Sequence, residues 1–267
     1  MRAPVTKSFR VGPEIAPEQF IAEHLFFYLV TGTLNGDYGN KNYTLKAGEY
    51  GIVRKNRLGR QSNQEENDKV EKVVIVFDEP FLKAFQEKQK VVVTKFKSTE
   101  SFLQIANNKL IPNFIHSLIL YYNGQGKIDN AFVDVKREEL LLILLQTQPE
   151  LSGVFFDYGI PSKINLEEFM NRNYKFNVSM QRFAYLTGRS LSSFKRDFKQ
   201  IFNDTPGNWL IKMRLQEAYF LIDKKSKMPT DIFVDLGFED LSHFSFAFKK
   251  MYGQNPTDLT WKKKTSS

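Results

Sequence analysis

The most regular hydrophobic pattern lies in the C-terminal part of the chain, where aromatic side chains recur at every fourth position in two runs. The runs are Phe194, Phe198 and Phe202, and then Phe244, Phe248 and Tyr252. Residues four apart lie on one face of a helix, so each run predicts an amphipathic helix with a buried aromatic face. The pattern repeats after fifty residues, so Leu191 and Ser192 correspond to Leu241 and Ser242.

A short helical segment and a glycine-containing turn precede each aromatic helix. The short helices are predicted over 180–186 and 230–236. A helix, a tight turn and a second helix form a helix-turn-helix motif, and two such motifs are predicted, at 180–202 and 230–252. Between them, the apolar spacing over 209–222 predicts a long amphipathic helix. We therefore expect an all-α domain with two helix-turn-helix motifs joined by a long helix.

Short apolar runs separated by turns dominate residues 24–77, and this pattern predicts β-strands. Strands are expected over 25–30 and 50–53, whereas 58–69 is polar and is predicted to be a loop. The run 73–77 is apolar at every position, so its strand is predicted to be buried on both faces. Several short strands joined by turns predict a small β-barrel or sandwich, which makes the whole chain an α+β multidomain protein.

The hydrophobic period becomes helical after Pro112. One helix is predicted around Phe114 to Tyr122 and a second over 131–147, separated by a glycine-rich turn at 123–126. Residues 140–145 are all apolar, so the second helix is expected to be buried on more than one face. The two helices should pack antiparallel, and their remaining apolar face suits the interface of a homodimer. The alternative is that this face packs against the β-domain of the same chain.

Positive charge is concentrated in the part of the chain that carries the repeat. The net charge is +8, and residues 162–267 contribute +7 of it, from 18 Lys and Arg against 11 Asp and Glu. A basic region beside a nearly neutral partner domain favours nucleic-acid binding, although a solvated basic surface is the alternative. The coincidence of this charge with two helix-turn-helix patterns favours DNA.

Composition excludes several other classes of protein. The 267-residue chain contains no cysteine, which excludes disulfides and thiolate metal sites. It has neither the roughly 18 successive apolar residues of a membrane-spanning helix nor the pattern of a signal peptide. We therefore expect no membrane contact and a cytoplasmic location.

Catalysis is not expected from this sequence. The three histidines, His24, His116 and His243, lie one in each region, so they cannot form a metal-binding cluster. A lone histidine in an apolar strand, such as His24, is more often a core residue than a ligand. Neither a nucleophile elbow nor a phosphate-binding glycine loop is present. We expect no catalytic residue, no metal and no cofactor.

The aromatic faces decide which side chains of the two helices can point toward DNA. These are Ser192, Ser193, Lys195, Arg196 and Lys199 in the first helix, and Ser242, His243, Ser245, Phe246 and Lys249 in the second. Arg196 is the best candidate for a bidentate contact to guanine, and Lys195 could contact a base or a phosphate. The serines near the start of the first helix suit phosphate contacts.

The second helix differs from the first at the most informative position. Phe246 stands fifty residues after Arg196, where it could touch a thymine methyl group or pack inward. We expect the second helix to add affinity and phosphate positioning more than sequence choice. Two recognition helices on one rigid unit could enter successive major grooves about 34 Å apart; the alternative is that one motif only packs.

The repeated region resembles the AraC/XylS family of bacterial transcription regulators over residues 163–263. The resemblance rests on Phe-Lys-Lys-Met-Tyr-Gly-Gln-Asn-Pro at 248–256, Asp-Leu-Gly-Phe at 235–238 and Arg-Leu-Gln-Glu-Ala at 214–218. Many members carry arginine where this chain has Phe246. The resemblance implies sequence-specific binding to double-stranded promoter DNA, most often to activate transcription through contacts with RNA polymerase.

The N-terminal half resembles the cupin-like effector domain of the same family around Tyr-Thr-Leu-Lys-Ala-Gly-Glu at 43–49. The helices that follow look like the family's dimerisation pair, and their layout is similar to the subgroup that activates type III secretion genes, where the effector can be a protein. Control by a small-molecule effector needs an enclosed apolar cavity, whereas control by a regulatory protein needs an exposed patch. The expected domains are a cupin-like regulatory domain at 1–97, a helical dimerisation segment at 98–150, a linker at 151–162 and an AraC-type DNA-binding domain at 163–263.

Overall fold

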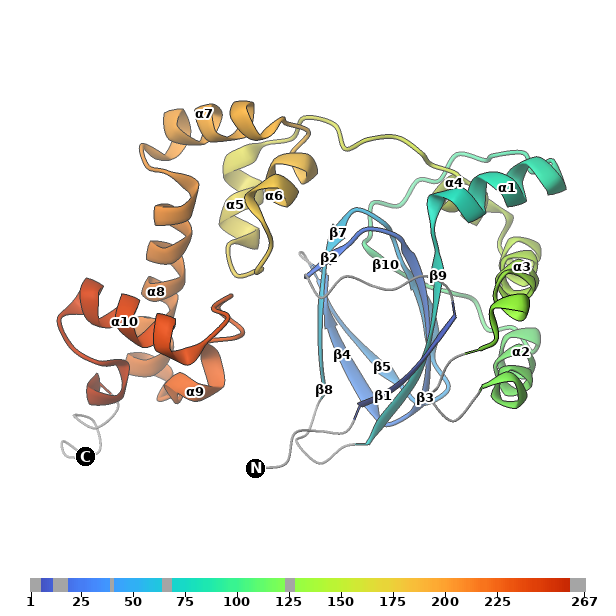
Figure 1. The fold of residues 1–267 in the computed structure, drawn as a ribbon, viewed down its shortest axis with the longest axis horizontal. Helices are drawn as coiled ribbons and strands as arrows, with labels where there is room; N and C mark the ends of the chain where they lie inside the picture. Colours follow the sequence, from blue (N-terminus) through green and yellow to red (C-terminus); the bar gives the residue numbers. More distant parts are fainter. Residues whose placement is uncertain (1–5, 12–18, 39–40, 64–68, 123–127, 260–267) are drawn as a thin grey trace. The chain divides into compact units, whose positions relative to one another are not determined.

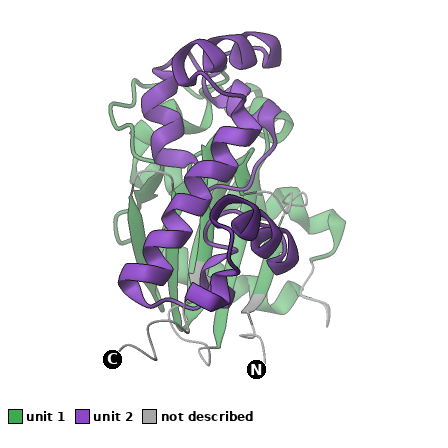
Figure 2. Cartoon of the chain, turned by 90° about the vertical axis from the view of Figure 1, so that its left-hand side faces the viewer, with its two compact units in different colours: residues 1–159 green, residues 160–267 purple. Residues whose placement is uncertain are grey.

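The chain forms two compact units, residues 1–159 and residues 160–267 (Figures 1 and 2). In the described residues the first unit contains all the strands and the second consists of helices, which confirms the predicted division into a sheet-rich and a helical part. The turn predicted at 123–126 lies outside the described residues. The computed structural model describes residues 6–11, 19–38, 41–63, 69–122 and 128–259.

The described strands of the first unit are β1 (Thr6–Val11), β2 (Phe20–Ile21), β3 (His24–Thr31), β4 (Thr33–Asp37), β5 (Asn42–Lys46), β6 (Tyr50–Val53), β7 (Arg57–Leu58), β8 (Arg60–Asn63), β9 (Val70–Phe77) and β10 (Phe102–Gln104). They form a five-stranded sheet in the order β1-β9-β3-β6-β10, a three-stranded sheet in the order β5-β4-β8, and the pair β2-β7. Neighbouring strands are antiparallel, except that β1 and β9 are parallel.

The helices of the first unit lie on one side of the five-stranded sheet (Figure 1). They are α1 (Glu79–Gln89), α2 (Leu110–Leu118), α3 (Asn130–Thr147) and α4 (Ser152–Phe155), with the 3-10 turns η1 (Ile119–Tyr121) and η2 (Pro149–Leu151). Leu140, Leu141 and Leu144 of α3 are fully buried, and Ile143 and Leu145 pack partly against the same core. Leu142 is 37% exposed, so the helix is buried over one broad face, and the prediction of burial on more than one face is wrong. The predicted first helix of the pair is α2, which ends at Leu118 and is followed by the short turn η1.

Side chains of β9 alternate between two hydrophobic cores. Val73, Ile75 and Phe77 pack with the helices, whereas Val74 and Val76 pack with apolar residues of β4 and β5. All five side chains are almost completely buried, which confirms the prediction of a strand covered on both faces. The five-stranded sheet is therefore the middle layer of the first unit.

The described ladders do not join the sheets into one continuous barrel. Strand β8 pairs with β4, and among the described residues no ladder joins β8 to β1 or β9. Face-to-face packing of the sheets around a shared core is present, and the closed barrel stays a prediction. The loop predicted over 58–69 is wrong at Leu58, which pairs with Phe20 of β2, and at residues 60–63, which pair with β4. Backbone pairing does not require apolar side chains, so the polar sequence of β8 did not indicate a strand.

Two predicted boundaries in the N-terminal half need correction. Residues 98–150 are not a separate helical segment, because β10 pairs with β6, and α2 and α3 share the core of the sheet. The predicted linker 151–162 begins too early, since Val154 and Phe155 are buried in that same core. Their burial makes η2 and α4 part of the first unit, which ends at Gly159.

His24 is a buried residue of β3, as its place in an apolar strand predicts. Its Nδ1 accepts a hydrogen bond from the Lys55 backbone N–H at 3.3 Å, its Nε2 has no partner in the described residues, and its ring meets the edge of Phe155. Burial lowers the pKa of His24 well below its ordinary value, and the nearby charges of Lys55, Arg54 and Arg57 lower it further.

Because the folded state holds His24 neutral, the first unit should lose stability as the pH falls below about 6.5, the pKa of an unperturbed histidine. Below that pH His24 is protonated in the unfolded chain but stays neutral in the folded chain. The free energy of unfolding should therefore fall by up to about 1.4 kcal/mol per pH unit. Urea unfolding of the first unit, followed by hydrogen exchange of β3 and β9 amides, should show this slope. The slope should shrink in His24→Gln, and an unchanged slope would contradict this account of His24.

The second unit contains the described helices α5 (Leu166–Asn173), α6 (Met180–Leu186), α7 (Leu191–Phe202), α8 (Pro206–Lys225), α9 (Pro229–Ile232) and α10 (Leu241–Tyr252). The first helix-turn-helix motif, α6 and α7, has the predicted bounds, and α8 is the predicted long helix. Helix α9 is shorter than the predicted segment 230–236. The chain continues instead through turns, closed by a hydrogen bond from the Gly237 N–H to the Val234 carbonyl oxygen.

Helices α7 and α10 begin and end in the same way. Ser190 and Asp240 cap them by accepting hydrogen bonds from the N–H of the third helical residue, at 3.2 and 2.6 Å. Asn203 and Gly253 follow them in the left-handed conformation. The predicted aromatic faces are confirmed, because the central rings are completely buried: Phe194, Phe198, Phe244 and Phe248.

Candidate nucleic-acid interface

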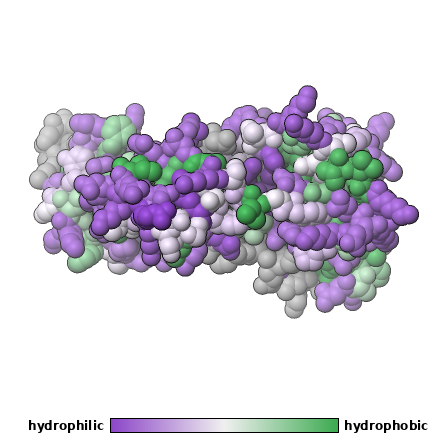
Figure 3. Space-filling view, turned by 90° about the horizontal axis from the view of Figure 1, so that it is seen from above, coloured by the Kyte–Doolittle hydropathy of each residue, from purple (hydrophilic) through white to green (hydrophobic). Residues whose placement is uncertain are grey.

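The outer face of α7 carries the polar side chains that the aromatic spacing predicts. Ser192, Lys195, Arg196 and Lys199 are exposed, and Ser193 is half-buried beside the helix cap. The surface is mostly hydrophilic in the left-hand half of Figure 3, where α7 faces the viewer. The structure therefore places all five predicted residues of this helix around one polar face.

An acidic residue lies among these basic side chains. The Asp197 carboxylate accepts a hydrogen bond from Arg189 Nε at 3.1 Å, and it lies 3.3 Å from Arg196 Nη2 and 3.4 Å from Lys163 Nζ. The hydrogen bond from Arg189 and the neighbouring positive charges lower the pKa of Asp197. The side chain of Arg189 is nearly buried and links the turn between α6 and α7 to α7 itself. Arg196 is 67% exposed, so its ion pair with Asp197 is weak.

Helix α10 presents a different chemistry at the corresponding positions. Ser242, His243 and Lys249 are exposed, and Ser245 is half-buried. Phe246 is 70% exposed, so the alternative that it packs inward is wrong. An aromatic ring thus stands on α10 where α7 presents the guanidinium of its exposed arginine.

Arg214 of α8 ties the two helix-turn-helix motifs together. Its guanidinium donates from Nε to the Tyr174 carbonyl at 2.8 Å, from Nη2 to the Phe176 carbonyl at 2.9 Å, and from Nη1 to the Gly237 carbonyl at 2.8 Å. The first two acceptors lie between α5 and α6, and the third lies in the turn before α10. Burial lowers the pKa of Arg214 to about 10, which keeps the group charged at neutral pH.

The backbone at Gly237 is shaped for this contact. Its φ is +84°, and a Cβ placed there would lie 2.6 Å from the Lys175 carbonyl oxygen and 2.7 Å from Arg214 Cζ. Lys175 lies in the loop between α5 and α6, and its Nζ pairs with the Glu217 carboxylate of α8 at 2.8 Å. This ion pair holds that loop against α8. The two motifs are therefore held in one fixed arrangement.

Sequence reasoning missed Arg189 and Arg214, because a charged residue in a turn or a helix is ordinarily solvated. The available hint was spacing: position 214 lies four residues after Leu210 and four before Ala218, on the buried face of α8. In the part of the chain that the structure describes, no group of three or more His, Asp or Glu is placed to hold a metal ion. The described helices also include none long and apolar enough to cross a membrane.

Two parts of the sequence match models of known protein families. Residues 24–154 match a model described as ExsA N-terminal regulatory domain, and residues 183–260 match a helix-turn-helix domain model. The chain belongs to the AraC/XylS family of transcription regulators. This family consists of DNA-binding regulators, so the AraC-family chain described here is not an enzyme.

Curated relatives agree with this assignment. The virulence regulon transcriptional activator VirF of Yersinia enterocolitica is 26% identical over 133 residues, 48% of this chain and 48% of VirF. The HTH-type transcriptional activator RhaS of Mannheimia succiniciproducens is 29% identical over 176 residues, 63% of this chain and 62% of RhaS. This AraC-family chain thus spans about half the length of VirF in that match. Among solved structures, ToxT from Vibrio cholerae matches over 91% of this chain and 92% of that chain, with a TM-score of 0.37 and 12% identity.

Proposed function

We propose that this chain is a sequence-specific DNA-binding regulator that acts on promoters through α7 and α10. The observation that carries the proposal is the pair of exposed polar helix faces, repeated after fifty residues and fixed to each other through Arg214. Helix α8, which separates them, has 20 residues. At 1.5 Å per residue it is about 30 Å long, close to the spacing of about 34 Å between successive major grooves.

The two helices have different roles in this proposal. Arg196 makes the bidentate contact to guanine, and Lys195 contacts a base or a phosphate. Ser192, Ser193 and Lys199 position the helix on the phosphate backbone. On α10, the exposed ring of Phe246 contacts a thymine methyl group, while Ser242, His243, Ser245 and Lys249 contribute mainly to affinity.

Selection from a pool of random duplexes at several salt concentrations tests this function. We expect an enriched motif with two half-sites about one helical turn apart. A steep salt dependence without any enriched sequence would mean that the chain binds phosphate only, and would overturn sequence-specific recognition.

Activation is the second part of the proposal. VirF and RhaS are described as transcriptional activators, and we place this chain with them as a cytoplasmic activator that contacts RNA polymerase. Transcription from a promoter that carries the selected motif should rise when the protein is added with RNA polymerase in vitro. Reduced transcription from the same template would identify a repressor.

The first unit offers a surface for self-association. Its exposed apolar side chains on η1 and α3 form what we call the η1–α3 patch: Ile119, Leu120, Tyr121, Phe132 and Val135. The rings of Tyr121 and Phe132 lie 5.1 Å apart, which makes the patch continuous from η1 to α3. Contiguous exposed apolar surface marks a protein contact site, and we propose that a second copy of the chain covers it.

Leu120→Lys should convert a dimer to a monomer, because Leu120 is 88% exposed and a lysine would be buried unpaired in the interface. Sedimentation at micromolar concentration measures the change, with Ile160→Lys as a control at another exposed aliphatic residue. A wild-type chain that sediments as a monomer would favour the other candidate, in which the same patch binds a regulatory protein and no small molecule takes part.

A further inference from the structure

The first residues of the second unit lie against the turn of the first helix-turn-helix motif. The Ile164 N–H donates to the Thr187 carbonyl oxygen at 3.4 Å, and Arg189 Nη1 donates to the Ile164 carbonyl oxygen at 3.0 Å. Gly188 in this turn has a φ of +65°, and a Cβ there would lie 2.4 Å from the carbonyl carbon of Ser162. The backbone from Ser162 to Ile164 is therefore held in place although it belongs to no helix or strand.

Lys163 lies between these contacts, which bring its side chain beside α7. Its Nζ is 3.4 Å from Oδ2 of Asp197, and its side chain is 66% exposed. The same oxygen already accepts the hydrogen bond from the nearly buried Arg189. Because an exposed ion pair is weak and an ammonium has three N–H donors, Lys163 keeps donors for a further anion.

The lysines of α7 itself lie on the other flank of the helix. Lys195 and Lys199 are four residues apart and share one side, whereas Asp197 is two residues from each and lies nearly opposite. Arg196, to which we assign a base contact, lies between the two flanks.

A recognition helix in the major groove lies between the phosphates of two strands, because the groove is only about 12 Å wide. One flank of α7 faces its strand with two lysines. On the other flank, the charge that α7 itself supplies is the Asp197 carboxylate, which phosphate would repel. Lys163, which the preceding segment of the chain places there, provides a positive charge on this flank.

We propose that Lys163 contacts a DNA phosphate, on the strand opposite to the one that Lys199 contacts. This inference rests on the proposed function and adds to it a residue outside both helix-turn-helix motifs. Because the backbone on both sides of Lys163 is already fixed, the contact orders only a side chain. Lys163 follows Gly159, the end of the first unit, by four residues, so the DNA-binding surface begins in the segment that connects the two units.

Fluorescence anisotropy with the full chain over a range of salt concentrations tests the contact. Lys163→Ala should weaken binding to the selected duplex and to a duplex of unrelated sequence by the same factor, roughly three- to tenfold, and reduce the salt slope by about 0.9. Lys163→Arg keeps a cation that can donate to phosphate, so it should bind as wild type does.

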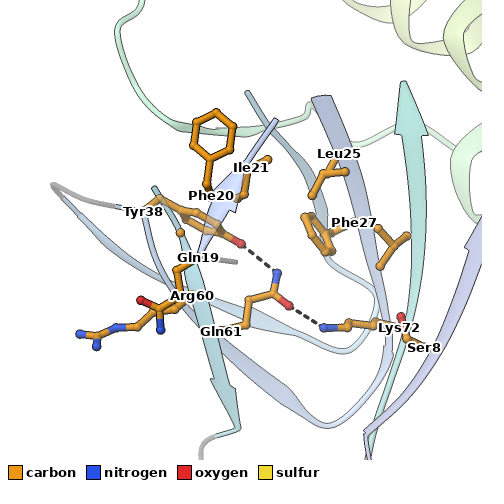
Figure 4. Close-up of a pocket in the computed structure, with 12 residues that line it drawn as sticks. Ser8, Gln19, Phe20, Ile21, Leu25, Phe27, Tyr38, Arg60, Gln61 and Lys72 are labelled. Carbon is orange, nitrogen blue, oxygen red and sulfur yellow. Dashed lines mark hydrogen bonds between the residues drawn. The ribbon is translucent and has the colours of Figure 1, made fainter. Parts of the chain in front are cut away.

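Two controls remove a cation of the first unit. Lys88→Ala removes an exposed lysine that pairs with Glu138. Arg60→Gln removes an arginine that pairs with Asp37 and whose guanidinium points away from the other labelled side chains in Figure 4. Both variants change the net charge of the chain as much as Lys163→Ala does, and neither should change the salt slope.

Uncharged methylphosphonates that replace single phosphates of the selected duplex locate the contact. One replacement should weaken binding of the wild-type chain but not of Lys163→Ala. A replacement on the other strand should weaken the wild-type chain but not Lys199→Ala. If both positions lay on the same strand, the assignment of Lys163 to the opposite flank would be wrong.

Gly188→Ala tests whether the turn positions Lys163. The added Cβ displaces the Ser162 backbone, so Lys163→Ala should cost less affinity in this background than in the wild-type chain. An equal cost in both backgrounds would contradict the role of the turn. Thermal unfolding shows whether Gly188→Ala folds, and if it does not, the single variant and the methylphosphonate duplexes decide the question.

Lys163→Ala with the affinity and salt slope of wild type would overturn this inference even if the duplex selection yields a motif. A wild-type chain that enriches no sequence would instead overturn the proposed sequence-specific function. In that case the salt slope of Lys163→Ala on an unselected duplex still measures the phosphate contact, because such a contact does not depend on sequence. The two failures are therefore distinguishable.

Discussion

Replacing Arg214 by methionine is expected to destabilise the second unit by about 3 kcal/mol or more. The guanidinium donates to three backbone carbonyl oxygens, and methionine would leave all three without that donor. Each buried polar group that loses its partner costs about 1–3 kcal/mol. Urea unfolding followed by tryptophan emission measures the loss, because Trp209 and Trp261 both belong to residues 160–267.

Two further variants define what Arg214 does. Arg214→Lys keeps the charge but cannot reach three acceptors as the planar guanidinium does, so an intermediate loss is expected. Gln216→Met, at an exposed position of the same helix, should change the unfolding free energy by less than about 0.5 kcal/mol. If Arg214→Met changed the unfolding free energy no more than this control, water would be able to replace the guanidinium. The contacts of Arg214 with the two motifs would then contribute little to stability.

Arg196→Ala is expected to weaken binding to the selected duplex roughly 5- to 150-fold, which corresponds to the 1–3 kcal/mol of a bidentate contact to guanine. The loss should fall on one base pair: the variant should bind duplexes with the other three bases at that position about as well as the original. Fluorescence anisotropy with the four duplexes at a fixed salt concentration measures this. The ion pair between Arg196 and Asp197 is no obstacle, since it is exposed and weak.

Lys199→Ala provides the contrast to Arg196. A phosphate contact carries no sequence information, so this variant should bind all four duplexes more weakly by the same factor and reduce the salt slope by about 0.9. Should Arg196→Ala also weaken all four duplexes equally, its contact would be to phosphate. If Phe246→Ala relaxed base preference and Arg196→Ala did not, the roles that we assign to α7 and α10 would be reversed.

The helical unit was largely predictable from sequence because its burial pattern is local. Phe194 and Phe198, four residues apart, define the buried face of α7 and thereby its outer residues. Strand β8 was not predicted, because its side chains are polar and its position depends on backbone pairing with β4. Helix α1 was not predicted either. The role of Arg214 depends on carbonyl groups distant in the sequence, which no local pattern reveals.

The matching caps at Ser190 and Asp240, and the matching ends at Asn203 and Gly253, describe one motif present twice in a single chain. Such duplication loosens an evolutionary constraint. Under the role that we propose for Arg196, α7 reads a base, and the equivalent position of α10 can differ without loss of that contact. The exposed phenylalanine at 246 is such a difference between the two copies.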